Sequence, residues 1–380
     1  MRIRFIAQYA DLNESKINRS FSPAGVSKMD YYLLCLFELG YKVNIFSTCA
    51  LQNKGFSALK KATNCLGQDI CYRSSFKLNN RYFKILDLCW GIFQVLCLLL
   101  FCDSKDIVFI YHERYYTPHI KKIVELRKLK VIVDIEEIYC IVHNLPINQA
   151  NKEISSLKFP KELSKYILAT SELCRLLSSQ SSYVVCCGAY SPFIKRSRLN
   201  DKTQILYGGV LNKNKGIGIV LESARYLSPQ EYEINICGFG NLSEIQETER
   251  LINENNENKN NCHITWHGKL IGKEYSRLMS NCDIGLACQI VSDDIGNNSF
   301  PSKIYEYLRN GLIVISSSVS AIRNSECSEI IKFFNNYTAK DLADLIDRVN
   351  KNSESNFQIQ QFLFRKHQEF KRNLKILIDG

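Results

Sequence analysis

The feature that most constrains the fold is a regular alternation of short apolar runs with longer amphipathic segments along the 380-residue chain. Short apolar runs bounded by turn residues predict buried strands, and the segments between them have helical apolar spacing. One series begins at residue 1 with IRFIAQYA, YKVNIFST, DIVFIY, KVIVDI, YILAT and YVVCC. A second begins near residue 203 with TQILYGG, EINICGFG, HITWHG, DIGLACQ, LIVISS and EIIKFF. This alternation predicts an α/β fold with two Rossmann-like domains built on parallel sheets.

Chain length agrees with two domains, because a single core typically stops growing below about 300 residues. The polar, basic segment YSPFIKRSRLNDK, residues 190–202, separates the two series. We therefore expect an N-terminal domain over residues 1–198 and a C-terminal domain over residues 199–355. The last stretch has the pattern of a long amphipathic helix, and we expect residues 356–380 to join the N-terminal domain.

Charge is distributed unevenly between the two halves. Residues 1–198 hold 28 Lys and Arg against 16 Asp and Glu, whereas residues 199–380 hold 21 against 22. A basic half is attracted to an anionic membrane, an anionic substrate or nucleic acid, or it is a solvated surface without a partner. No zinc, helix-turn-helix or RNA-binding pattern accompanies the charge, so we expect no nucleic-acid partner.

The sixteen cysteines contain no CxxC and no paired ligand spacing, so they predict neither a disulfide framework nor a metal site. Most lie in apolar runs, as Cys237 and Cys288 do, which is typical of small buried hydrophobes in a reducing compartment. The opening MRIRFIAQYA is a strand pattern rather than a signal peptide. These features favour a cytoplasmic location.

One run, LCWGIFQVLCLLLFC at residues 88–102, is uncharged and membrane-like. It is shorter than the about 20 residues that a spanning helix needs. We therefore expect a buried helix or one that lies at a membrane interface.

Ligands in open α/β sheets bind beyond the carboxyl ends of the strands, and two glycine turns occur there in the second series. TQILYGG precedes Lys213, Lys215 and Gly216 at a helix start, where backbone N–H groups and a lysine can cradle a phosphate. EINIC precedes a GFG turn, which lets a ligand approach the backbone. Position 243 is Ser rather than the third glycine of a dinucleotide fingerprint, which disfavours NAD. Each turn alone also has a purely structural explanation.

The stretch SFPSKIYEYLRNGLIVISS, residues 299–317, reads as a short helix followed by a strand. Pro301 fits the first turn of the helix and Gly311 fits its C-terminal cap. Lys303 and Glu306, three residues apart, share a face distinct from the apolar one. That face either carries a solvated ion pair or holds an anionic, hydroxyl-rich ligand.

The order of these features is more specific than any one of them: GG, NKNKG, GFG, HG at 267–268, NCDIGLACQ and FPSKIYEYLRNGLIVISS. In this order, over roughly residues 203–320, they resemble the C-terminal domain of retaining glycosyltransferases with the GT-B fold, close to glycosyltransferase family 4. SPAGVSKMDYYLLCLFELGYKVNIFS and YILATSELCRLL also look like the acceptor-side domain of capsule and O-antigen transferases. The resemblance implies two Rossmann-like domains facing a central cleft.

By this resemblance the protein is a hexosyltransferase of the retaining type. It would move a sugar from a nucleotide-diphosphate donor to a lipid-linked or polysaccharide acceptor, in the biosynthesis of cell-surface glycans such as lipopolysaccharide. The resemblance also implies that no cofactor or metal is needed.

The resemblance assigns roles to individual residues. Lys215 matches the lysine that binds the donor diphosphate, and Glu306 matches the second glutamate of the EX7E motif, which binds the ribose. The other residues expected around the donor are Gly25, Gly209, Lys213, Gly238, Gly240, Ser302 and Lys303.

Two positions depart from the family pattern. Asn298 replaces the first glutamate of the motif, which contacts the donor sugar, and Val210 replaces an arginine on the diphosphate. An asparagine can hydrogen-bond sugar hydroxyls but brings no charge to an oxocarbenium-like centre. We expect Lys213, Lys303 or an N-terminal residue to replace the arginine.

Four ionisable residues of the N-terminal half follow strand-like runs, namely His112, Glu113, Glu136 and Glu137. Either a surface role or a place in the site fits each of them. Glu136 stands near the position at which related transferases carry a histidine that contacts the donor sugar. We therefore take Lys215, Asn298 and Glu136 as the catalytic candidates.

Three hypotheses follow. The first is a glycosyltransferase at the inner face of the cytoplasmic membrane, where the basic half contacts anionic lipid. The second is a nucleotide-sugar epimerase of the same fold, which would convert its donor without an acceptor. The third is a catalytically silent binding protein, which Asn298 and Val210 would explain.

Overall fold

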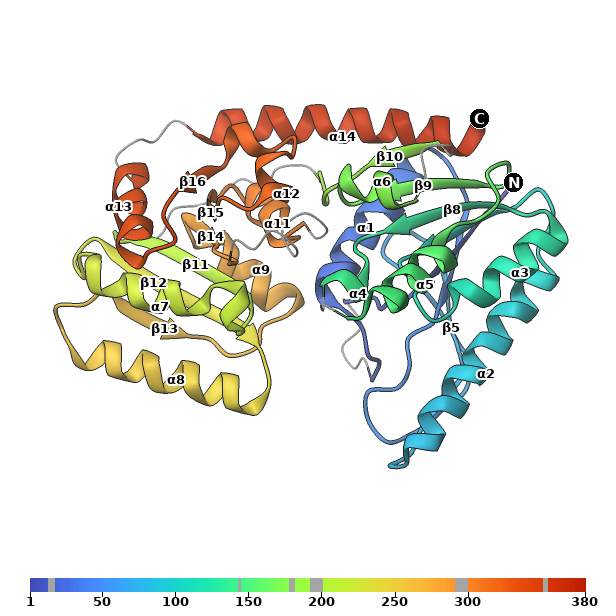
Figure 1. Ribbon diagram of the computed structural model, residues 1–380, viewed down its shortest axis with the longest axis horizontal. Coiled ribbons are helices and arrows are strands. Elements are labelled where there is room, and N and C mark those ends of the chain that lie inside the picture. Colours follow the sequence, from blue (N-terminus) through green and yellow to red (C-terminus); the bar gives the residue numbers. More distant parts are fainter. Residues whose placement is uncertain (13–17, 143–144, 178–181, 192–200, 291–299, 351–354) are drawn as a thin grey trace. The chain divides into compact units, whose positions relative to one another are not determined.

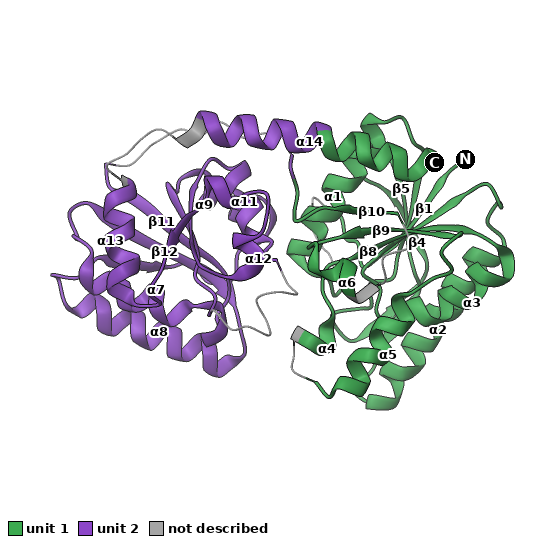
Figure 2. Ribbon diagram, turned by 45° about the horizontal axis from the view of Figure 1, so that its top comes forward, with its two compact units in different colours: residues 1–189, 369–380 green, residues 190–368 purple. Residues whose placement is uncertain are grey.

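The computed structural model describes residues 1–12, 18–142, 145–177, 182–191, 201–290, 300–350 and 355–380 (Figure 1). The chain forms two compact units: residues 1–189 with 369–380 make unit 1, and residues 190–368 make unit 2 (Figure 2). The domain boundary expected at 198/199 lies outside the described residues, and the division falls at 189/190. The C-terminal helix, expected to join the first domain from residue 356, contributes to unit 1 from residue 369 onward.

Unit 1 is built on an eight-stranded sheet of order β10-β9-β8-β7-β1-β2-β5-β4. Its strands are β1 (Ile3–Ala7), β2 (Val43–Ser47), β4 (Lys60–Thr63), β5 (Asp69–Tyr72), β7 (Ile107–Tyr111), β8 (Lys130–Ile135), β9 (Ser164–Leu168) and β10 (Tyr183–Val185). All neighbours are parallel except β4, which runs antiparallel to β5. A separate antiparallel ribbon pairs β3 (Gly55–Ser57) with β6 (Ser75–Lys77).

Helices cover both faces of this sheet. They are α1 (Pro23–Glu38), α2 (Arg81–Leu100), α3 (Thr117–Arg127), α4 (Tyr139–Val142), α5 (Ile147–Leu157), α6 (Glu172–Leu177) and the end of α14 (Ser355–Asp379). Side chains of α2, α3 and α5 share one apolar core with the strands. On the opposite face Tyr32 of α1 contacts the rings of both Phe109 and Phe370, so α1 and the end of α14 cover that side.

Unit 2 has a fully parallel six-stranded sheet of order β13-β12-β11-β14-β15-β16. The strands are β11 (Thr203–Val210), β12 (Tyr232–Phe239), β13 (His263–Trp266), β14 (Ile284–Ala287), β15 (Ile313–Ser317) and β16 (Lys332–Phe334). The helical elements are η1 (Lys213–Lys215), α7 (Ile217–Ser223), η2 (Ala224–Tyr226), α8 (Leu242–Glu257), α9 (Gly272–Ser280), α11 (Lys303–Arg309), α12 (Ser320–Arg323), η3 (Ser328–Ile330), α13 (Ala339–Asn350) and most of α14.

Helices α7, α8 and α13 share an apolar core with one face of the unit 2 sheet. On the other face, α11 is tied to the strand layer by Tyr307, whose hydroxyl accepts a hydrogen bond from the Gly208 amide at 2.9 Å. A Cβ on Gly285 would lie 2.4 Å from the Tyr307 ring, so the absent side chain makes room for this helix. Both units are therefore three-layer, doubly wound folds, which confirms the α/β class expected from the sequence.

The twelve apolar runs that predicted strands all contain one. The ribbon β3–β6 and strands β4 and β5 were not predicted. The helix expected at residues 88–102, with a length below the about 20 residues of a spanning helix, was predicted too short. In the structure α2 begins at Arg81 and is 20 residues long. Among the described residues it is the one helix long and apolar enough to cross a membrane, judged by length and composition alone. Pro301 precedes α11 rather than lying in its first turn, since the helix begins at Lys303 after the N-cap Ser302.

Candidate functional site

In unit 2 the strand order reverses between β11 and β14, and ligands of open α/β sheets bind at the carboxyl ends of such a pair. Gly209, near the end of β11, has φ +147°, a value that favours glycine. The Lys303 ammonium lies 3.8 Å from where a Gly209 Cβ would be. The same Nζ sits over the Tyr207 ring, 4.2 Å from its centroid. The end of β11 thus brings a bare backbone and a cation together.

The turn after β11 is built to hold a fixed shape. Asn212 caps η1 by accepting a hydrogen bond from the Asn214 amide at 2.8 Å. Gly216 follows with φ +86°, and a Cβ there would lie 1.7 Å from the Cys288 carbonyl oxygen. Only glycine allows this approach, so the turn that carries Lys215 is fixed against the end of β14.

Lys303 and Glu306 are both half-buried on the first turn of α11. Burial and, to a lesser extent, the nearby Lys215 ammonium together lower the pKa of Lys303 to about 8. Burial raises the pKa of Glu306 to about 7, against the opposing charges of Arg309 and Lys303. The pKa values of both groups therefore lie close to neutral pH. Desolvated ionisable groups at strand ends are typical of functional sites.

The two glycines after β12 have packing reasons of their own. A Cβ on Gly238 would lie 2.0 Å from the Gly209 carbonyl oxygen, so the glycine is needed for the approach of β12 to β11. A Cβ on Gly240 would lie 2.8 Å from a carboxylate oxygen of Glu244. That glutamate forms the capping box of α8 with Asn241. These contacts explain the GFG turn without a ligand, and they place it beside Gly209.

The remaining donor-side candidates differ in their surroundings. Lys213 is exposed on η1, two residues before the half-buried Lys215. Ser302 is exposed at the N-cap of α11, and its side chain makes no capping hydrogen bond. Asn298 lies outside the described residues. Lys215, Lys303, Glu306 and Gly209 are therefore the candidates that the fold gathers at one strand edge.

In unit 1, Glu136 follows β8 and pairs with a buried lysine. The Lys28 ammonium of α1 lies 2.6 Å from a Glu136 oxygen and also donates to the Cys186 carbonyl at 2.7 Å. Two residues before Glu136, the buried Asp134 accepts a hydrogen bond from the Tyr32 hydroxyl at 2.8 Å. The three ionisable side chains come from two distant parts of the sequence and form one cluster beside the ends of β7 and β8.

The charges in this cluster are unequal. Burial raises the pKa of Asp134 well above its ordinary value, and the adjacent Glu136 charge raises it further. Burial also acts against ionisation of Glu136, but the Lys28 ammonium and the hydrogen bond from Asp134 outweigh it and lower its pKa. The pair therefore carries one negative charge, on Glu136, balanced by Lys28.

The other N-terminal candidates surround this cluster. Gly25 lies in the first turn of α1, and a Cβ there would be 3.8 Å from the Tyr111 ring. His112 has φ +42°, and its Nδ1 accepts from the Glu136 amide at 3.3 Å. Glu113 is buried, with only 1% of its surface exposed, and burial raises its pKa to about 7. Glu137 is half-buried after β8.

Sequence reasoning missed Lys28 and Asp134. A signal for each was present: an aspartate interrupts the apolar run KVIVDI, and a lysine stands among the apolar positions of the first helix. A charged residue on a face that is expected to be buried requires a partner. Lys28 pairs with Glu136, and Asp134 accepts a hydrogen bond from Tyr32.

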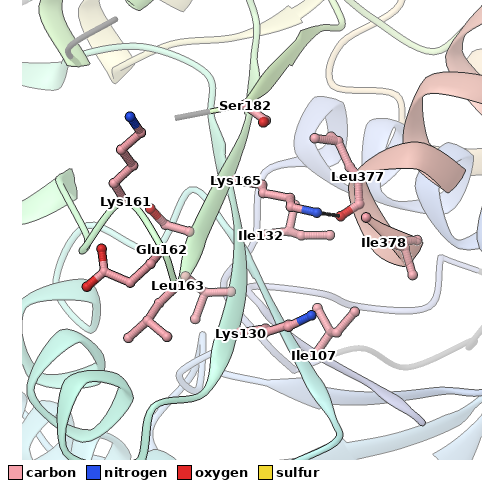
Figure 3. A pocket seen from close by; sticks show the side chains of 13 residues that line it. Ile107, Lys130, Ile132, Lys161, Glu162, Leu163, Lys165, Ser182, Leu377 and Ile378 are labelled. Carbon is pink, nitrogen blue, oxygen red and sulfur yellow. Dashed lines mark hydrogen bonds between the residues drawn. The ribbon is translucent and has the colours of Figure 1, made fainter. Parts of the chain in front are cut away.

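A groove of about 170 Å³ lies away from these edges, at the amino ends of β8 and β9 in unit 1 (Figure 3). Lys130, Lys161 and Lys165 line it together with the end of α14, and Lys165 donates to the Leu377 carbonyl at 2.8 Å. Burial and the neighbouring Lys130 lower the pKa of Lys165. No cluster of three or more His, Cys, Asp or Glu that could hold a metal ion occurs within the described ranges.

Known structures share this architecture over nearly the whole chain. A trehalose-6-phosphate synthase, OtsA, superposes with a TM-score of 0.70 at 12% identity, covering 100% of this chain and 99% of that one. A Burkholderia xenovorans α,α-trehalose-phosphate synthase (UDP-forming), in complex with glucose-6-phosphate, gives 0.69 at 10% identity with 100% of both chains covered. Anabaena HepE in complex with UDP gives 0.60 at 11% identity, covering 99% and 97%. At such identities the likeness shows the fold, which is GT-B.

A search of curated proteins finds no sequence match to this chain. The family described as Glycosyl transferases group 1 matches residues 192–362, which contain Lys215, Lys303 and Glu306. The match supports the enzyme class expected from the sequence, while the capsule and O-antigen type is not singled out by the structural neighbours. Most of unit 2 thus matches the Glycosyl transferases group 1 model, and the chain has the GT-B fold.

Proposed function

We propose that the protein transfers a sugar from a nucleoside-diphosphate-sugar to a lipid-linked or polysaccharide acceptor, as a family 4 transferase of the capsule and O-antigen type does. The observation that carries the donor half of the proposal is the gathering of Lys215 and Lys303 at the Gly209 backbone, on the edge where β11 and β14 part. A diphosphate carries enough negative charge to keep both ammonium groups ionised, because its attraction offsets the burial and the Lys215 repulsion that lower the Lys303 pKa.

The two lysines also suit the chemistry. When the bond between the sugar and the diphosphate breaks, negative charge develops on the departing phosphate oxygen. Fixed cations aimed at that oxygen stabilise the transition state more than the ground state. We propose that Lys215 and Lys303 supply this stabilisation without a metal ion, and that the acceptor hydroxyl attacks from the side on which the diphosphate leaves, with retention of configuration.

Glu306 and Glu136 have separate roles in the proposal. A Glu306 carboxylate next to Lys303 can accept hydrogen bonds from ribose hydroxyls. Glu136 keeps its charge because of Lys28, so it can accept a hydrogen bond from a sugar hydroxyl. Asn298, outside the described residues, stays a prediction for the donor-sugar contact.

Two classes of acceptor are candidates. The trehalose-phosphate synthase from Burkholderia xenovorans is in complex with glucose-6-phosphate, so a sugar phosphate is a second candidate acceptor. The basic excess of residues 1–198 favours an acceptor at an anionic membrane, at its cytoplasmic face, in cell-surface glycan synthesis. An acceptor panel containing a sugar phosphate and a lipid-linked saccharide separates these two.

The first test is a thermal-shift screen over UDP, GDP, TDP and CMP with their sugars, because a ligand that binds only the folded state raises the unfolding temperature. We expect one nucleotide to stabilise the protein. If none does, a catalytically silent protein becomes the better description. Conversion of the donor without any acceptor would instead indicate an epimerase.

The second test replaces Lys215 with Ala and uses Lys259→Ala as the control, since Lys259 is exposed between α8 and the amino end of β13. Loss of a charge that acts in the transition state costs on the order of 10²-fold or more in kcat. We expect that loss for Lys215→Ala and a small effect for Lys259→Ala, with unfolding temperatures close to wild type. Full activity of Lys215→Ala would refute the assigned role.

A further inference from the structure

Helix α2 has two faces with opposite surroundings. The inner face consists of Asp87, Gly91, Val95 and Leu99, spaced four residues apart, and all are buried. A Cβ on Gly91 would lie 2.4 Å from the Tyr116 hydroxyl and 3.1 Å from the Arg73 guanidinium. The helix therefore sits on unit 1 at a distance that only glycine permits.

A buried ion pair fixes this seating. Arg73, 1% exposed, donates to Asp87 of α2 at 3.1 Å and to the Thr48 carbonyl at 2.9 Å. Separating the pair would leave one charge buried without its partner, which is strongly unfavourable. Although α2 is long and apolar enough to span a bilayer, spanning would require this separation. The structure favours a helix that stays on its own unit.

The outer face of α2 is apolar and open. Tyr82 is 72% exposed, Ile85 52% and Phe93 54%. Leu86 and Leu100 are exposed beside them, as is Trp90, whose ring stacks on Phe93 with centroids 5.5 Å apart. Soluble proteins rarely leave a contiguous apolar stripe of this kind uncovered unless it has a binding partner.

The ribbon β3–β6 extends the stripe. It lies beside the N-terminal turn of α2, where the Phe76 and Phe83 rings meet. Phe56 on this ribbon is 74% exposed, and Leu78 just after it is 47% exposed. We refer to the exposed apolar side chains of α2 and of this ribbon as the apolar tip.

Cations accompany the apolar tip and fix the chemistry of its partner. Residues 51–100 contain seven Lys and Arg against two Asp and Glu. One of the two acids is Asp87, which is buried against Arg73. Lys54, Arg81 and Lys84 are exposed next to the apolar side chains. A second copy of the same basic surface would be repelled, whereas an anionic lipid surface satisfies both the charge and the apolar side chains.

We propose that the apolar tip docks unit 1 on an anionic bilayer, with α2 lying along the interface and its outer aromatic side chains in the headgroup region. Trp and Tyr are the residues that prefer this depth, because an apolar ring and a polar tip are both satisfied there. The inference deepens the membrane location within the proposed function. It does not depend on sugar transfer, so vesicle binding tests it separately from activity.

The test uses the two tryptophans of the chain, Trp90 and Trp266. In a Trp266→Phe variant, Trp90 alone reports on α2. This protein is mixed with phosphatidylglycerol-containing vesicles and with pure phosphatidylcholine vesicles, and binding is measured by flotation. Lipids brominated near the headgroup end of the acyl chain then show whether the Trp90 ring lies at the membrane interface. We expect flotation with the anionic vesicles, weaker at high salt, and quenching of Trp90.

Variants separate this surface from general basicity. Ile85→Ser with Phe93→Ser should lower vesicle affinity at least tenfold, whereas Phe364→Ser, at a still more exposed position of α14 (66%), should not. Lys54→Gln with Lys84→Gln should lower it about fivefold per lysine. The outward side chains leave the core intact, so unfolding temperatures serve as the folding control. Absence of binding, binding without Trp90 quenching, or wild-type binding by the Ile85 and Phe93 variant would each overturn the proposal.

Discussion

The depressed pKa of Lys303 makes a quantitative prediction about nucleotide binding. Its value of about 8 means that half of the Lys303 side chains are uncharged at pH 8. A diphosphate held next to the ammonium favours the charged form and raises the pKa. Formation of the complex at pH 8 should therefore take up about half a proton per site. The same linkage should weaken binding about fourfold between pH 7 and pH 8.5.

Calorimetric titration with a nucleoside diphosphate measures this uptake. At pH 8, the observed enthalpy is plotted against the ionisation enthalpy of several buffers, and the slope gives the protons taken up. Glu306, with a pKa of about 7, is already mostly ionised at pH 8 and contributes little. The choice of pH thus isolates Lys303 from its neighbour.

Two variants make the result decisive. Lys303→Arg keeps the positive charge but cannot lose its proton, so it should bind with a slope near zero. Lys213→Arg, an exposed position on η1, should keep the wild-type slope of about one half. A slope near zero in the wild type, or an unchanged slope in Lys303→Arg, would show that Lys303 is not the group that takes up the proton and would refute the reasoning.

Three further predictions concern stability. Burial holds the pKa of Glu306 near 7, above its value in the unfolded chain, so the native state loses stability as pH rises from about 4.5 to about 7. Glu306→Gln removes this loss, and its stabilising effect should therefore be roughly 3 kcal/mol larger at pH 8 than at pH 4. Urea unfolding of unit 2 measures the difference. Gly216→Ala should cost on the order of 3 kcal/mol and weaken nucleotide binding, whereas Gly218→Ala, which meets nothing within 4 Å, should be nearly neutral in the same assays. Lys28→Met should destabilise unit 1 by about 3–5 kcal/mol, and adding Glu136→Gln should recover part of that loss if the cost comes from the unpaired carboxylate.

The sequence predicts the layers of the fold well because each buried parallel strand is a short apolar run. Such a run can be recognised without knowing which strands it pairs with. It predicts the ribbon β3–β6 poorly, since GFS and SFK are only three residues long and GFS is mostly exposed. The start of α2 was missed for a similar reason. Arg81 and Lys84 precede the uncharged run, and charged residues in a first turn do not look like part of an apolar helix.

The candidate site divides in the same way. Lys303 and Glu306 could be placed on one face because they are neighbours on a single helix. The pairing of Lys28 with Glu136 joins residues 108 positions apart, and no local pattern encodes such a contact. The lowered pKa of Lys303 also depends on the tertiary structure, since burial and Lys215 cause it. Sequence reasoning can therefore name the site residues but not their charge states.

Helix α14 has a consequence for how the protein is made. Its last twelve residues complete unit 1: Phe370 packs on Tyr31 and Tyr32, Lys371 lies 2.6 Å from Glu38, and the Asp379 carboxylate accepts from Tyr41 at 2.6 Å. On the ribosome, residues 1–189 are synthesised first. This aromatic surface stays uncovered until all of unit 2 and then residues 369–380 have been synthesised. Until then unit 1 is an incomplete fold with exposed tyrosine rings, and it is the stage at which a chaperone would be most needed.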